Sequence, residues 1–226
     1  MKIFRAQKGP FTEQPFYEPK DIEAICIQEL QSVALYPKKP EPIRIDRFIE
    51  KRFNVVPEYE ELEDGVLGLT VFGPKGVEKI VVAKALDQEN TKVAERRIRT
   101  TLAHESGHGL LHAHLFLLAS KQPQFDSFTK ESDPKVLCRD IPAGTAERTS
   151  YDGRWWEYQA NLVIGALLLP RPLVLAVLAT FISGNGIARR EEAALELAEV
   201  FNVNPAVAKI RIKELSPEIS ARQKQI

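Results

Sequence analysis

The chain is organised around one short segment, His104-Glu105-Ser106-Gly107-His108. Its two histidines are four positions apart, so on a helix both imidazoles lie on one face. Two neutral imidazoles on one face can bind a single zinc ion, and a glutamate beside the first can take a proton from a water that attacks a carbonyl. The segment therefore predicts a zinc site and metal-assisted peptide hydrolysis, with Glu105 as the catalytic base.

The sequence on both sides of this motif has helical periodicity. Apolar side chains recur at helical spacing from Val93 to Leu102 and again from Leu110 to Phe116, which predicts one long, largely buried helix over 91–116. Gly107 and Gly109 each cost a helix interior about 1 kcal/mol relative to alanine, which indicates close approach by another backbone or a ligand. The alternative interpretation is a core helix whose histidines are satisfied by hydrogen bonds alone.

The remaining pattern predicts an α+β fold. Before the motif helix we expect helices over 21–35 and 45–53 and strands over 55–59, 66–72 and 77–84. The last two strands form a hairpin across 73–76, and Cys26 is a small core residue of the first helix. A small antiparallel or mixed sheet packed on the motif helix results, and one of its edge strands can pair with an extended substrate.

Length, charge and cysteine content limit the classes of protein. A chain of 226 residues suffices for one domain and a small appendage, and 31 basic and 31 acidic side chains leave no net charge. Overall charge therefore gives no reason to expect nucleic acid as a partner. Two cysteines are too few for a disulfide scaffold, which favours a reducing cytoplasm. The chain should not bind a membrane, because residues 1–19 lack the apolar core of a secretory signal and Pro170-Arg171-Pro172 splits the longest apolar run.

A catalytic zinc site needs a third protein ligand, and two further histidines follow the motif. His112 lies about 6 Å beyond His108 along the axis of a continuous helix, so it suits a supporting or core position. His114 occupies the third histidine position of the pattern HExxHxxGxxH. Leu111 stands where that pattern has the glycine at which the helix ends, so His114 is the weaker alternative.

The favoured third ligand is Glu157, at the start of a predicted helix over 155–169. Asn161 follows one turn later on the same face, where it can orient a ligating histidine through a hydrogen bond. A solvated glutamate in a first helical turn is the alternative interpretation of Glu157.

Three segments carry a family resemblance: AHESGHGLLH at 103–112, WEYQAN at 156–161 and LLLP at 167–170. They resemble the ImmA/IrrE family of metallopeptidases, in which an AHExGHxxxH-like helix is followed by an ExxAN helix ending in LLMP. The resemblance covers about residues 46–215 and implies a zincin-like fold, with His104, His108 and Glu157 as zinc ligands and Glu105 as the catalytic base. Two departures are the long segment between the ligand-bearing helices and Leu169 in place of methionine.

The resemblance also implies a substrate, a helix-turn-helix transcriptional repressor of the Xre type, whose cleavage relieves repression. The leading hypothesis is therefore a cytoplasmic zinc-dependent endopeptidase of the gluzincin type. Two alternatives come from other classes: a zinc-fold regulatory module that docks a repressor without cutting it, and a DNA-binding regulator that uses residues 187–215.

We divide the chain into a zincin-like metallopeptidase domain at 1–183 and a helical segment at 184–226 that resembles a helix-turn-helix. Helices over 187–200 and 205–215 flank a turn in this segment, and the second carries Lys209, Arg211 and Lys213. From 189 to 226 there are seven basic and six acidic residues, a net charge of only +1. This balance favours packing or partner docking over phosphate binding.

The first domain contains an insertion at 119–154, rich in polar residues and proline, which is a lid or a plain loop. Cys138, in a short strand expected over 135–141, is either a small core residue or a thiolate that occupies the open zinc position. The hydrogen-bond donors near the motifs that suit an oxyanion are Tyr151, Arg154, Tyr158 and His112. The pattern does not choose among them.

Overall fold

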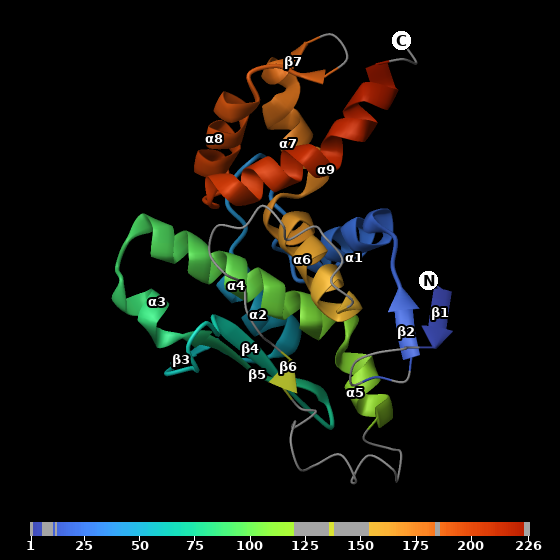
Figure 1. The fold of residues 1–226 in the computed structure, drawn as a ribbon, viewed down its shortest axis with the longest axis vertical. Helices are drawn as coiled ribbons and strands as arrows, with labels where there is room; N and C mark the ends of the chain where they lie inside the picture. The colour runs from blue at the N-terminus through green and yellow to red at the C-terminus, as the bar shows by residue number, and fades with distance from the viewer. Residues whose placement is uncertain are drawn as a thin grey trace.

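The computed structural model describes residues 2–5, 11, 13–119, 136–137, 154–183 and 186–223. These residues form a mixed α+β fold in which the long helix α4 lies between a small sheet on one side and further helices on the other (Figure 1). The helices are α1 (Pro19–Ser32), α2 (Ile45–Phe53), α3 (Lys84–Gln88), α4 (Lys92–Leu111), α5 (Ala113–Ala119), α6 (Trp155–Leu168), α7 (Arg171–Leu178), the 3-10 helix η2 (Ala179–Phe181), α8 (Arg190–Val200) and α9 (Pro205–Gln223). The strands are β1 (Lys2–Arg5), β2 (Glu13–Phe16), β3 (Glu58–Glu60), β4 (Gly68–Gly73), β5 (Gly76–Ala83), β6 (Val136–Leu137), β7 (Ile182–Ser183) and β8 (Gly186–Ile187).

The main sheet of the described residues has the strand order β3-β5-β4-β6. β4 and β5 form the predicted antiparallel hairpin, whereas β3 pairs parallel to β5, so the sheet is mixed. β5 begins directly after the turn at Gly76, whose φ of 115° is readily available only to glycine. The strand expected over 55–59 begins later, at Glu58, because Pro57 has no amide hydrogen to donate to a ladder.

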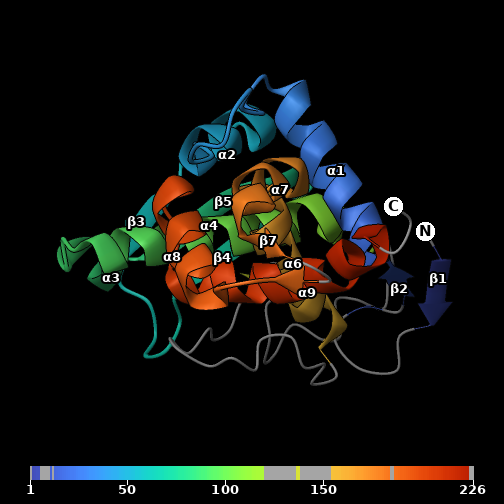
Figure 2. The ribbon, with the colours of Figure 1, turned by 90° about the horizontal axis from the view of Figure 1, so that it is seen from above.

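Helices and sheet pack on opposite sides of α4. β4 and β5 lie against one side of α4, α6 crosses its other side, and α1 packs on α6 (Figures 1 and 2). Along β4, buried and half-buried residues alternate, as expected for a strand with one face on the core. Cys26 of α1 is fully buried in this core, as predicted. α4 therefore lies in the middle of the core, and most of the motif is shielded from water.

The motif helix is shorter than the periodicity predicts. The expected continuous helix over 91–116 is wrong: α4 ends at Leu111, and α5 begins at Ala113 after a break at His112. α4 starts as expected, because the Thr91 side chain accepts a hydrogen bond from the Ala94 amide and caps the first turn. At this break, the His112 side chain contacts His108 and Gln159.

The N-terminus contains structure that the sequence pattern missed. β1 and β2 form an antiparallel two-stranded sheet where an irregular start was expected. This hairpin lies beside the lower half of the molecule in Figure 1, next to α5 and α6. α3 and the β7–β8 pair were not anticipated either.

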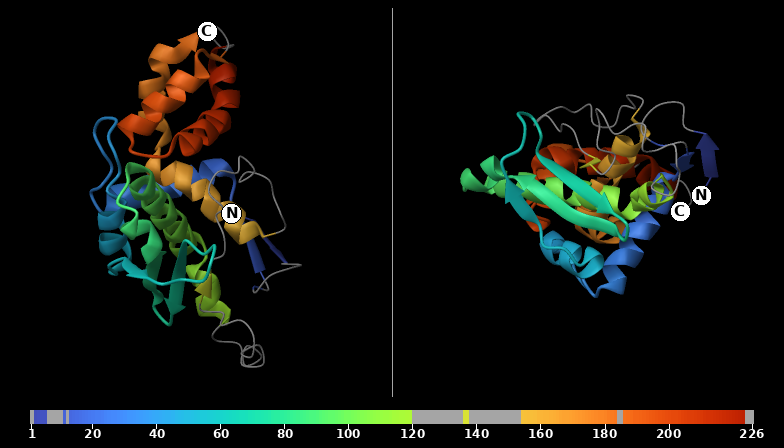
Figure 3. Two further views of the ribbon diagram at one scale, coloured as in Figure 1. Left: turned by 60° about the vertical axis from the view of Figure 1, so that its left-hand side comes forward. Right: turned by 90° about the horizontal axis from the view of Figure 1, so that it is seen from below.

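The C-terminal helices stack on the side of α4 opposite the sheet (Figure 3). The predicted pair of helices is present as α8 and α9, and Asn202 in the turn between them has a φ of 50°. One apolar cluster runs from α1 through α6 into α8 and α9. The boundary placed after residue 183 falls between the paired strands β7 and β8, and the division into two domains stays a prediction.

The apolar helices in the described part of the chain are short relative to a membrane span. No single helix there is long and apolar enough to cross a membrane. The helices α6 and α7, with η2, reach that length and composition only as a pair, which is bent by 58°.

Candidate metal centre

The two helices that carry the predicted ligands touch at Gly107. A side-chain carbon at Gly107 would lie 3.0 Å from both Ala160 Cα and Val163 Cβ of α6. The close backbone approach predicted from this glycine is therefore confirmed. The other motif glycine, Gly109, instead faces the side chains of Phe53 and Val77. Contact at Gly107 places the start of α6, with Glu157, against the histidine face of α4.

Three ligand atoms converge at this crossing: His104 Nε2, His108 Nε2 and Glu157 Oε2. The two histidine nitrogens are 3.1 Å apart, and the Glu157 oxygen is 3.1 Å from His104 and 3.6 Å from His108. Tetrahedral ligands about 2.0–2.2 Å from a zinc ion are separated by about 3.3–3.6 Å. The triangle thus has nearly the size that a small tetrahedral cation requires.

The electrostatics of this triangle favour a positive charge at its centre. Both histidines are buried, and Glu157 is only 9% exposed. Burial alone raises the pKa of Glu157, but the charge interaction with His108 and hydrogen bonds from both histidines outweigh it and hold the pKa well below its usual value. Burial alone lowers the pKa of His108, yet the Glu157 carboxylate raises it above its usual value. A buried His104, His108 and Glu157 group can therefore hold a metal ion.

Glu105 lies beside the triangle and points to the sheet. Its Oε2 accepts a hydrogen bond of 2.7 Å from the hydroxyl of Thr70, a residue on the buried face of β4. Its Oε1 has no partner among the described residues, and a side chain at Gly68 would come within 3.2 Å of that oxygen. Burial raises the pKa of Glu105, opposed by the nearby histidines and the Thr70 hydroxyl. A carboxylate with a raised pKa and a free oxygen is suited to proton transfer.

The two further histidines, His112 and His114, lie in different surroundings. His112 is fully buried, with Nδ1 3.1 Å from His108 Nδ1, a position compatible with the expected supporting or core role. The helix is not continuous through His112, contrary to the expectation, but His112 still lies outside the candidate metal group. His114 is exposed on α5 and is not part of the candidate metal group. Gln159, which the sequence reasoning missed, bonds His112; its position two residues after Glu157 was the only available signal.

The remaining predicted site residues are less well placed. No hydrogen bond joins Asn161 to a ligand: Asn161 Oδ1 and His104 Nδ1 are both buried without a partner among the described residues. Asn161 instead lines a cavity between α6 and α9 together with Tyr158. Its orienting role stays a prediction. Arg154 is exposed, whereas Tyr151 and Cys138 lie outside the described residues, so the thiolate hypothesis does too.

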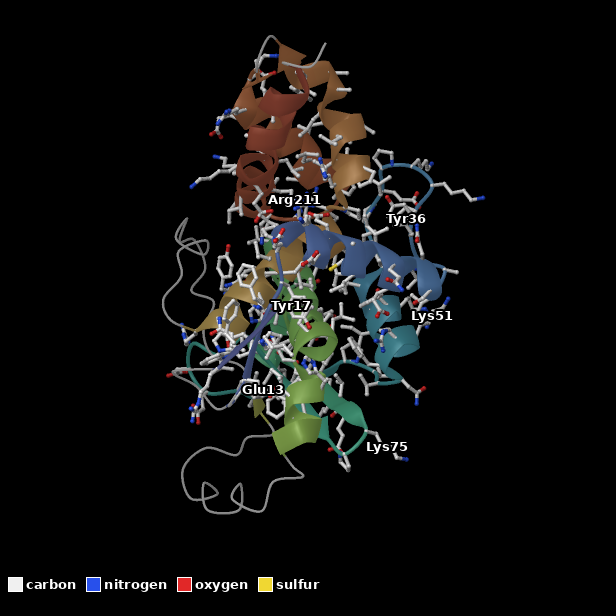
Figure 4. The ribbon with its side chains drawn as sticks, turned by 90° about the vertical axis from the view of Figure 1, so that its right-hand side faces the viewer. Glu13, Tyr17, Tyr36, Lys51, Lys75 and Arg211 are labelled. Atoms are coloured by element: carbon white, nitrogen blue, oxygen red, sulfur yellow. The ribbon has the colours of Figure 1, made fainter. Side chains whose placement is uncertain are left out.

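The three basic residues singled out on α9 differ in exposure: Lys209 and Lys213 are exposed, whereas Arg211 is buried. Arg211 is only 3% exposed, pairs with Glu23 of α1 and Glu214, and donates to the Leu169 carbonyl. Figure 4 shows Arg211 where α9 meets α1. Lys209 pairs with Glu191 of α8 at the surface. Arg211 therefore ties α9 to the rest of the molecule.

No family model matches this chain, and no curated protein matches it in sequence. What defines the site is a buried group of two histidines and one glutamate, donated by two helices and accompanied by a second buried glutamate.

Proposed function

We propose that the protein is a zinc-dependent endopeptidase with a zincin-like fold. The observation that carries the proposal is the triangle of His104, His108 and Glu157, together with Glu105 beside it. Nitrogen and oxygen donors in a three-residue set, at tetrahedral spacing, are typical of catalytic rather than closed structural zinc sites. In the alternative interpretation, a core helix satisfied by hydrogen bonds, nothing requires both histidines to face the same oxygen of one carboxylate, as His104 and His108 face Glu157 Oε2.

The proposed chemistry divides between the ligands and Glu105. Zinc held by the triangle supplies Lewis-acid activation of water and of the scissile carbonyl. Glu105 accepts a proton from the attacking water and then donates it to the leaving amine, so that peptide and water become a carboxylate and an amine. Thr70 orients the carboxylate of Glu105 through its hydroxyl, because its hydrogen bond fixes one of the two oxygens.

An extended protein segment is the substrate that fits this arrangement. β4 carries Thr70 beside Glu105, and its outer edge already pairs antiparallel with β6, with Thr70 opposite Leu137. An extended substrate would pair with β4 close to the base in place of β6, through the backbone hydrogen bonds by which many proteins bind peptides. By the resemblance of its motifs, the substrate is a repressor of the Xre type, and the compartment is the cytoplasm.

Metal analysis and a matched pair of variants test this function. Wild-type protein should contain near-stoichiometric zinc, and His104→Ala or Glu157→Ala should lose it, whereas His114→Ala should keep it. Glu105→Gln should keep zinc and the fold but lose cleavage of the Xre-type repressor encoded beside this gene. An amide cannot accept the proton of the attacking water.

Three outcomes would contradict parts of the proposal. Equal cleavage by wild type and Glu105→Gln removes the base mechanism. Zinc loss in His114→Ala with retention in Glu157→Ala replaces the ligand set. Repressor binding without cleavage by zinc-loaded wild type supports the docking module instead.

A further inference from the structure

A chain of buried hydrogen bonds runs from one metal ligand to the N-terminal hairpin. His108 Nδ1 lies 3.1 Å from His112 Nδ1, and His112 Nε2 lies 3.0 Å from Gln159 Oε1. The Gln159 amide nitrogen then donates a hydrogen bond of 2.8 Å to the backbone carbonyl of Pro15 in β2. Figure 4 labels Glu13 and Tyr17, which flank Pro15 along the chain. Residues far apart in sequence thus form one connected path.

The position of each proton along this path follows from the Pro15 backbone carbonyl at its end. A backbone carbonyl only accepts, so the Gln159 NH2 group must face Pro15, and its Oε1 must face His112. Since Oε1 only accepts as well, the proton of His112 is on Nε2. His112 Nδ1 is then an acceptor, and His108 Nδ1 must carry the proton that it donates.

This assignment requires a neutral His112, and its surroundings supply the reason. The ring is fully buried and hydrogen-bonded to the neutral amide of Gln159 and the imidazole of His108; of the more distant charged groups, Glu157 favours a proton on His112 and His114 opposes it. The edge-on ring of Trp155 adds no charge. A charged imidazolium there would be buried without an anionic hydrogen-bond partner, which is costly.

We propose that His112 and Gln159 are positioning residues that hold His108 in the tautomer protonated on Nδ1, with Pro15 as their anchor. In that neutral tautomer, His108 Nε2, which lies 3.1 Å from His104 Nε2 and 3.6 Å from Glu157 Oε2, carries the lone pair that a metal ligand must have. The N-terminal hairpin is then part of the metal centre. No comparable partner fixes His104, whose Nδ1 is unpartnered among the described residues. The proposal rests on the proposed zinc site but not on the hydrolysis.

The tautomers can be read directly by nitrogen NMR of the full chain with labelled histidine, stripped of metal by a chelator. Only four histidines are present, so assignment by single substitution is practical. At a pH at which both imidazoles are neutral, we expect His108 to be protonated on Nδ1 alone and His112 on Nε2 alone. Gln159→Met, close in size to the native residue, should shift His112 toward Nδ1 protonation and lower the Nδ1-protonated fraction of His108.

Zinc affinity supplies the second measurement. Gln159→Met should weaken zinc binding by roughly 10–100-fold, the usual effect of removing an outer partner of a metal ligand. The matched control is Thr100→Val, which removes a buried hydroxyl whose 2.8 Å hydrogen bond to the Arg96 carbonyl stays within α4. This control should keep both the tautomers and the zinc affinity.

A wild-type His108 with an unprotonated Nδ1 overturns the proposal. So does a Gln159→Met protein that loses zinc affinity with unchanged tautomers, because that loss would be structural only. Because the NMR measurement uses metal-free protein, it decides this proposal even if the wild type binds no zinc and the proposed function fails.

Discussion

Replacing Gly107 with alanine should damage zinc binding more than stability. Alanine improves helix propensity by about 1 kcal/mol over glycine, whereas forcing an extra carbon into a packed core costs about 1–3 kcal/mol. The new carbon would lie 3.0 Å from Ala160 Cα and 3.2 Å from Ala160 O, and ordinary carbon contacts are about 3.5–4.0 Å. These neighbours belong to the α6 backbone and cannot rotate away, so α6 must move by about 0.5–1 Å.

Such a movement is small for the core but large for a metal site. The net change in the free energy of unfolding should be a loss of about 0–2 kcal/mol. Ligand distances in a zinc site, however, tolerate only about 0.2 Å. Because Glu157 moves with α6 while both histidines stay on α4, zinc affinity should fall about tenfold or more.

Gly109→Ala is the matched control on the same helix. Its new carbon would meet Phe53 Cζ at 2.8 Å and Val77 Cγ2 at 3.0 Å, which are the ends of side chains and can shift. Urea denaturation of metal-free protein and chelator competition for zinc measure the two effects. Gly109→Ala should keep wild-type zinc affinity. A Gly107→Ala protein that binds zinc as tightly as wild type, or an equal loss in both variants, would refute the role given to this crossing.

Two further predictions concern the base and the C-terminal helices. Thr70→Val removes a hydrogen bond that lowers the pKa of Glu105, so the pKa of Glu105 should rise further. Since the base must be ionised, the acidic limb of the kcat/KM profile should move to higher pH. An acidic limb that stays in place would contradict the role of Thr70. Arg211→Met leaves two partly buried carboxylates unpaired and should cost on the order of 3 kcal/mol in urea denaturation, whereas Lys209→Met breaks only a surface pair and should cost no more than about 1 kcal/mol. Equal losses in the last two variants would show that Arg211 does not hold α9 in place.

The motif helix and the shared face of its two histidines were predictable because helical spacing relates sequence directly to geometry. His104 and His108 share a face on any α-helix, and the glycine between them indicated a close backbone contact before its partner, Ala160, was known. The α2 helix and the β4–β5 hairpin were likewise predictable from periodicity and turn residues.

Long-range pairing was beyond the reach of these patterns. The parallel contact of β3 with β5 and the β1–β2 hairpin depend on tertiary neighbours rather than on local spacing. The break at His112 was missed because apolar residues continue at helical spacing on both sides of it. Gln159 was missed for a similar reason: its partners are His112 and Pro15, the second of which lies 144 positions away.

A long segment between α4 and α6 is compatible with short distances in the candidate site, because the packing of the two helices and not the length of their connection sets those distances. His104 and Glu157 are 53 positions apart, yet their ligand atoms are 3.1 Å apart. The contact of Gly107 with α6 fixes that distance, and the hydrogen bonds through Gln159 hold α6 to α4 from a second direction. The entropy of closing a loop grows only with the logarithm of its length, so extra residues there cost little as long as the α4–α6 contact is kept. Sequence length between the motifs is therefore free to change, while Gly107, Ala160 and Gln159 are the positions at which we expect the candidate metal centre to be sensitive.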